Sequence, residues 1–155
     1  MRKHSLDKLM NRLSLLLLLG TAVFLAVYWR SIPEEVPMHF NAAGEIDRWD
    51  SKWGLLMLPV ITWLVYGFLT VAEQIFGICG NGAKGPEKNR EQAFILLGHL
   101  LSTQKLLFTA LFTWITLWCA LALPLPAWFL PATLAVVFGD MAYWIVRLIW
   151  NKSLR

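Results

Sequence analysis

The side chains that could do chemistry gather in residues 36–52, between the first two apolar stretches of the chain. An imidazole, three carboxylates, a carboxamide, a guanidinium and an ammonium lie within fourteen positions there. His39 has two interpretations. It could cap the backbone of this loop, or it could act as a pH sensor, a metal ligand or an acid–base group. If the protein recognises a ligand, this segment is the first place to expect it.

His39, Glu45 and Asp47 could together supply the three protein ligands of a catalytic zinc site. Their spacing matches no zinc signature, and the segment contains no second histidine and no cysteine. A membrane metal-dependent enzyme that uses these three residues is therefore the alternative hypothesis. We expect no catalytic residue, no metal and no other cofactor.

Turn signals lie inside this segment. Residues 41–44, Asn-Ala-Ala-Gly, suit a tight turn in which Asn41 bonds to nearby backbone and Gly44 takes a positive φ. Lys52 is unusual, because a cation in the first turn of the following helix opposes the helix macrodipole. Either a carboxylate partner or a ligand would relieve that conflict. The candidate partners are Glu45, Asp47 and Asp50.

The elements that position this segment are membrane helices. A hydrophobic fraction of 57%, only 15% charged residues and a mean hydropathy of +0.54 leave too few polar residues to cover a soluble domain. About 20 apolar residues cross a bilayer as a helix. The apolar runs predict an all-α integral membrane protein, a bundle of four transmembrane helices. The predicted spans are residues 13–29, 54–76, 98–122 and 128–149.

These spans divide the chain into segments with different environments. Residues 1–12 form an amphipathic N-terminus, and residues 13–77 contain the first two spans and the loop 30–53 between them. We expect that loop to be ordered and extracytoplasmic, because it separates two spans and has turn residues. Residues 78–97 are a predicted cytoplasmic loop, and residues 98–155 contain the last two spans and the C-terminus.

The basic residues predict the orientation of the helices. Eleven of the fourteen lysines and arginines fall in the N-terminal tail, the second loop with its flank and the C-terminal end. Cytoplasmic segments carry such an excess. Both termini should therefore be cytoplasmic, as in a multi-pass protein of the bacterial cytoplasmic membrane. The net charge of +4 is explained by this topology, and we expect no nucleic-acid partner.

Four ionisable residues interrupt the later spans: Glu73, His99, Lys105 and Asp140. A charge in a membrane helix is costly, so Asp140 should face other helices. If a turn at residues 123–126 joins two antiparallel helices, Thr109 and Thr113 lie level with Asp140 and Lys105 lies deeper. We therefore expect a protonated or hydroxyl-bonded Asp140. The group either holds helices together or, in a small transport or accessory subunit, forms an ion path.

The loop also carries a family resemblance. Its pattern is Pro37-x-His39-Phe40-Asn41-x-x-Gly44-Glu45-x-Asp47-x-Trp49-x-Ser51-Lys52, followed by a span with an early Leu58-Pro59. This pattern resembles the bacterial SdpI-like membrane proteins, which share a domain of unknown function with the SdpI immunity protein. The resemblance covers residues 15–77 and implies protection of a cell from a secreted toxic peptide. It also implies capture of a cytoplasmic repressor at the membrane.

The sequence thus predicts a membrane protein with a non-enzymatic recognition role, either immunity to a toxic peptide or signal reception. The expected partners are the lipid bilayer, an extracytoplasmic peptide or lipid headgroup, and a cytoplasmic regulator. The residues expected to contact the ligand or to organise the loop are His39, Asn41, Gly44, Glu45, Asp47, Trp49 and Lys52.

Overall fold

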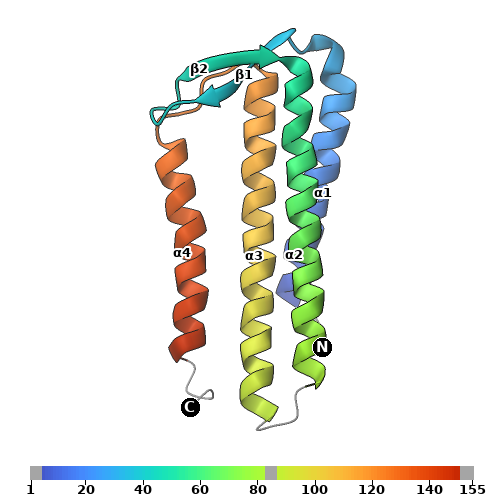
Figure 1. Ribbon diagram of the computed structural model, residues 1–155, viewed down its shortest axis with the longest axis vertical. Coiled ribbons are helices and arrows are strands. Elements are labelled where there is room, and N and C mark those ends of the chain that lie inside the picture. Colours follow the sequence, from blue (N-terminus) through green and yellow to red (C-terminus); the bar gives the residue numbers. More distant parts are fainter. Residues whose placement is uncertain (1–4, 83–86, 151–155) are drawn as a thin grey trace.

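The computed structural model describes residues 5–82 and 87–150 (Figure 1). Most of them are helical, in α1 (Ser5–Tyr28), α2 (Met57–Gly82), α3 (Glu87–Ala120) and α4 (Phe129–Trp150). All four helices are long and apolar enough to cross a membrane. The described chain therefore has the architecture of a multi-pass membrane protein, as its apolar runs predict.

The helices extend beyond the predicted spans at the end of the molecule where α1 begins and α4 ends. α1 begins at Ser5, within the segment expected to be an amphipathic N-terminus. α2 continues to Gly82 and α3 starts at Glu87, so residues 78–82 and 87–97 are helical where we expected a loop. Residues 87–92 are rich in Glu, Lys, Arg and Gln, which are good helix formers, and this explains why α3 begins so early.

α3 is the central helix. It packs against α1, α2 and α4, whereas α4 packs mainly against α3 alone. Figure 1 shows α1 and α2 on one side of α3 and α4 on the other. The four predicted helices are present, but they do not pack equally against one another. α1, α2 and α3 form a three-helix group, and α4 lies beside it.

The segment between α1 and α2 is a β-hairpin, so the all-α prediction needs a correction. β1 (Glu35–Phe40) pairs antiparallel with β2 (Ile46–Ser51), between two short 3-10 helices, η1 (Trp29–Ser31) and η2 (Lys52–Leu56). The hairpin lies across the helix ends opposite to Ser5 and Trp150 (Figure 1). We call this the hairpin end, and we call the other the terminal end.

A small apolar core anchors the hairpin to the helices. Val36 of β1 and Leu55 of η2 are completely buried. They cluster with residues of α1 and α3 at the hairpin end of the molecule. Met38 and Phe40 lie at alternate positions after Val36 and pack against the same cluster. Alternate residues of a strand share one face. β1 therefore turns this face toward the core, which fixes the position of the hairpin on the helix ends.

Candidate functional site

The tip of the hairpin is a tight turn built by Asn41. Its Oδ1 accepts hydrogen bonds from the backbone N–H of Ala43 at 2.9 Å and of Glu45 at 3.0 Å. Its Nδ2 donates to Oε2 of Glu45 at 2.8 Å. Gly44 has a φ of +84°, which favours glycine. The predicted roles of Asn41 and Gly44 in the turn are confirmed, and Glu45 is bound within the turn.

Gly44 also brings the hairpin against the connection between α3 and α4. The backbone N–H of Leu125 donates to the carbonyl of Gly44 at 2.9 Å. A Cβ atom on Gly44 would lie 2.2 Å from the carbonyl oxygen of Leu125, too close for any side chain. The hairpin tip is therefore held from two sides. The pattern of the sequence predicted the turn, but it did not predict this contact.

His39 pairs with Asp47 across the two strands. Nδ1 of His39 lies 2.6 Å from Oδ1 of Asp47, and the two side chains are 62% and 42% exposed. The interpretation of His39 as a cap on loop backbone is thus replaced by a cross-strand ion pair or hydrogen bond. Among the described residues, no group of three His, Cys, Asp or Glu side chains could hold a metal ion. The metal-dependent enzyme therefore gains no support from this geometry.

Lys52 has a different partner from the ones expected. Its Nζ lies 2.7 Å from Oε1 of Glu34, and its backbone N–H donates to the Glu34 carbonyl at 2.9 Å. The ammonium also lies 5.7 Å from the ring centre of Trp29, a cation–π distance. The expected partners Glu45, Asp47 and Asp50 are wrong. The strand register pairs Glu35 with Ser51, which places Glu34 opposite Lys52.

The outer strand of the hairpin is exposed along its length. Residues 47–51 are all exposed, whereas Val36 and Pro37 of the partner strand are buried. Trp49, a large aromatic side chain, is 50% exposed. The sheet has only two strands, so no further strand of the described chain pairs with the other edge of β2. β2 thus exposes charged and aromatic side chains and a backbone edge that pairs with no other described strand. The contacts of Gly44 and Lys52 hold the hairpin in place.

A second polar cluster lies toward the terminal end, among the helices. Nζ of Lys105 lies 3.0 Å from Oε1 of Glu73, and these side chains are 1% and 5% exposed. Ser102 donates to the same carboxylate oxygen at 2.9 Å, and Lys105 also donates to the Thr70 hydroxyl at 3.1 Å. Glu73 and Lys105, two of the ionisable residues noted in the predicted spans, form a buried ion pair between α2 and α3. Asp7, Glu73, His99, Lys105 and Asp140, with the side chains that contact them, are called the inner polar layer.

His99 extends the inner polar layer to α1 and α4. Its Nδ1 lies 2.5 Å from Oδ1 of Asp7 in α1, and its ring centre lies 5.3 Å from that of Trp144 in α4. Asp7 was not among the site residues predicted from the sequence, although it lies in the first turn of α1. A carboxylate is an unusual neighbour for a membrane helix, and that is the signal that could have identified it.

Asp140 joins α4 to α3 in the inner polar layer. It accepts hydrogen bonds from the Thr103 hydroxyl at 2.7 Å, from Gln104 Nε2 at 3.0 Å and from Trp144 Nε1 at 3.0 Å. A hydroxyl partner was predicted, but Thr109 and Thr113 were the wrong ones. Thr109 instead bonds to the Lys105 carbonyl, and Thr113 to Thr21 of α1.

The register between α3 and α4 explains this difference. Phe129 at the start of α4 stacks on Trp114, with ring centres 6.1 Å apart. Trp114 lies six residues before the end of α3 at Ala120, or about 9 Å along the helix axis. α4 therefore begins well below the end of α3. Asp140 therefore lies closer to the terminal end than it would if α3 ended and α4 began at the same height.

Comparison with known proteins concerns the hairpin and the helices that carry it. Residues 16–63 match a family described as "Domain of unknown function (DUF1648)". The matched segment contains most of α1, the whole hairpin and the start of α2. Searches of curated proteins and of solved structures found no match. The matched domain thus coincides with the hairpin and its supports.

Proposed function

We propose that this protein is a multi-pass protein of the bacterial cytoplasmic membrane whose hairpin recognises an extracytoplasmic peptide without catalysis. The observation that carries the proposal is the contrast within the hairpin. Its tip and base are fixed by the contacts of Gly44 and Lys52, and β2 is left open. Recognition sites gain affinity when the binding surface is organised before the ligand arrives.

Orientation follows from the distribution of charge. Most lysines and arginines lie toward the terminal end or in the segments that flank its helices, which favours a cytoplasmic location for that end. The hairpin then faces the outside of the cell. Labelling of a cysteine introduced at Glu45 in intact cells tests this directly. A membrane-impermeant maleimide should react there, and reaction only after the cells are opened would contradict the orientation.

A peptide fits the hairpin better than an anionic lipid headgroup does. Residues 34–52 contain five carboxylates and two cationic side chains, so the hairpin is acidic when His39 is neutral. Such a surface repels anionic headgroups and attracts a cationic peptide. The free edge of β2 can also add an extended chain as a third strand, a common mode of peptide recognition.

The residues of the site then divide into two groups with different tasks. Asn41, Gly44, Glu45 and Lys52 hold the shape of the hairpin through the contacts described above. The exposed side chains of β2 and its neighbour His39 contact the peptide. These contact residues are His39, Asp47, Arg48, Trp49 and Asp50.

The resemblance to SdpI-like proteins suggests which peptide the hairpin binds. We propose that it is a secreted toxin and that its capture protects the cell. The match of residues 16–63 to a domain of unknown function supports the importance of this segment, because it contains the hairpin. A cytoplasmic regulator would bind at the terminal end, where α2 and α3 extend beyond their candidate spans.

Photo-crosslinking in living producer cells tests the recognition. A photoreactive amino acid at Trp49 should capture a peptide, whereas the same amino acid at Leu64, on the exposed surface of α2, should not. Alanine at both Arg48 and Trp49 should then abolish rescue of a deletion strain while the protein still accumulates in the membrane. Full rescue by that variant, or equal capture from both positions, would contradict the proposal.

A further inference from the structure

The carboxylates of the hairpin differ in the partners that the hairpin itself provides. Glu34 pairs with Lys52 at 2.7 Å, and a lysine ammonium ordinarily keeps its charge throughout the physiological pH range. Glu45 accepts a hydrogen bond of 2.8 Å from the side-chain amide of Asn41, a group that carries no charge. These two partners do not change with pH, so both carboxylates remain engaged in holding the hairpin.

Asp47 differs from them because its partner is an imidazole. Nδ1 of His39 lies 2.6 Å from Oδ1 of Asp47. Imidazole is the side chain whose charge ordinarily changes between about pH 5 and 8. A protonated His39 neutralises the charge of Asp47. A neutral His39 can donate the same hydrogen bond from Nδ1, but it leaves the carboxylate with its full negative charge. Protonation therefore changes the charge of this surface while the pair keeps its geometry.

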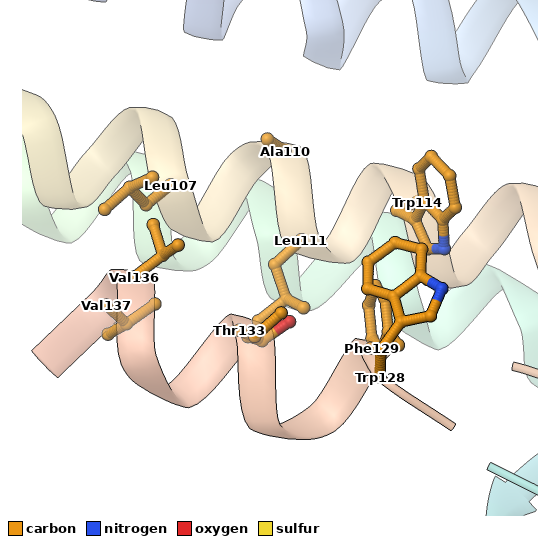
Figure 2. Close-up of a pocket in the computed structure, with 10 residues that line it drawn as sticks. Leu107, Ala110, Leu111, Trp114, Trp128, Phe129, Thr133, Val136 and Val137 are labelled. Carbon is orange, nitrogen blue, oxygen red and sulfur yellow. The ribbon is translucent and has the colours of Figure 1, made fainter. Parts of the chain in front are cut away.

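Few other charged groups face this pair. Arg48 lies opposite His39 in the strand register, and Glu45 is held in the neighbouring turn. η2, which also packs on β1, contributes Lys52, and that side chain is paired at the base of the hairpin. α3, which contacts β1, the connection that follows it and the first part of α4 contain no charged side chain in residues 106–139. The side chains of α3 and α4 drawn in Figure 2 are accordingly all uncharged.

The surroundings of Asp47 suit a ligand cation. Both side chains of its pair are exposed, and Trp49, two residues further along β2, is exposed as well. A lysine or arginine side chain can bind the carboxylate with its charged end and cover the indole with its apolar stem. Glu35 is also exposed, but it follows the residue that binds Lys52, whose ammonium repels a cation. Asp47 is therefore the better site for a positive charge.

We propose that His39 regulates recognition by the hairpin, because it competes with a lysine or arginine side chain of the bound peptide for Asp47. This inference rests on the proposed recognition of a peptide. A protonated His39 neutralises the carboxylate and repels the incoming cation, so binding favours the neutral imidazole and releases a proton. Affinity for a cationic peptide therefore rises as the pH rises through the range in which imidazole loses its proton. Asp47 then determines the preference for a cation.

The test uses the full chain in phosphatidylcholine nanodiscs and a rhodamine-labelled, N-terminally acetylated peptide of alternating lysine and threonine. Fluorescence anisotropy measures its binding at about pH 5.5 and about pH 7.5, a range in which the lysines ordinarily keep their charge. Binding should be about two- to five-fold tighter at the higher pH, the size of an exposed ion pair. A peptide with glutamine in place of lysine should bind more weakly and show no such change. His39→Gln keeps a donor for Asp47 without a charge, so it should bind the lysine peptide equally at both pH values.

Two further variants locate the cation. Asp47→Asn should weaken binding of the lysine peptide at both pH values and remove its pH dependence. Glu35→Gln removes one negative charge elsewhere on the hairpin and is the matched control, so the pH dependence should remain. Unchanged pH dependence in His39→Gln, or equal losses from Asp47→Asn and Glu35→Gln, would overturn the role of this pair while peptide binding itself stands. Absence of binding at both pH values would also overturn it, and cross-linking from Trp49 then decides the proposed function separately.

Discussion

Gly44 and Leu125 join two connections that are far apart in the sequence through one backbone hydrogen bond of 2.9 Å. The bond links the tip of the hairpin to the segment between α3 and α4. Since the carbonyl of Leu125 occupies the place of a Cβ on Gly44, the contact depends on the missing side chain. The hairpin is thus coupled to both halves of the molecule, α1 with α2 through its base and α4 through its tip.

Replacement of Gly44 by alanine should destabilise the hairpin end. A non-glycine residue in the left-handed region costs about 1–2 kcal/mol, and the new methyl group must also push Leu125 away. Thermal unfolding in detergent should therefore show a lower midpoint for Gly44→Ala. Gly20→Ala is the control, because nothing lies within 4 Å of a Cβ there. Equal midpoints for the two variants would contradict the contact.

Loss of one partner of the Glu73–Lys105 pair should be more damaging than loss of both. Lys105→Met leaves a buried carboxylate and Glu73→Leu leaves a buried ammonium, and either change typically costs about 3–5 kcal/mol. The double variant removes both charges. Its unfolding free energy should lie well above the value expected from adding the two single losses. Additive losses in this double-mutant cycle would show that the two side chains do not interact.

Asp140 should hold α4 against α3 through its hydrogen bonds and should not carry ions. Asp140→Asn keeps one oxygen acceptor for its three donors, so folding and deletion rescue should both persist. Asp140→Leu removes the side-chain contacts of Asp140 with Thr103 and Gln104, which keep backbone carbonyls as acceptors, and leaves the Trp144 indole without its acceptor. It should loosen α4, at about 1–3 kcal/mol for the unsatisfied indole. A folded Asp140→Asn protein that no longer rescues the deletion strain would instead favour transport.

The two ion pairs of the hairpin should differ in their effect on stability. His39→Ala should change the unfolding free energy by about 1 kcal/mol or less, because its pair with Asp47 is exposed. Lys52→Ala should cost more, since its side chain is 12% exposed and also contacts the ring of Trp29. Unfolding midpoints of the two variants test this order, and the reverse order would show that the base contact is unimportant.

Local features of this molecule could be predicted from the sequence. The turn at Asn41 and Gly44 depends on residues next to each other in the chain, so its side-chain bonds follow from residue type alone. The four helices that are long and apolar enough to cross a membrane follow from the length of the apolar runs in the same way. In both cases the decisive interactions join residues that are close in the sequence, so no knowledge of distant contacts is needed.

Partners across elements could not be predicted, because they depend on register. Lys52 reaches Glu34 since the strands pair Glu35 with Ser51, a register that composition does not reveal. Asp140 reaches Thr103 because α4 starts below the end of α3. The number of residues in the connection does not reveal this offset.

The marginal attachment of α4 has a consequence for biogenesis. The buried Glu73–Lys105 pair joins α2 and α3, so it can form before α4 is synthesised. A nascent chain can therefore assemble its first three helices while the ribosome is still translating the last. The bond from Leu125 to Gly44 involves a residue that follows α3, so it can form only after the first three helices have been synthesised.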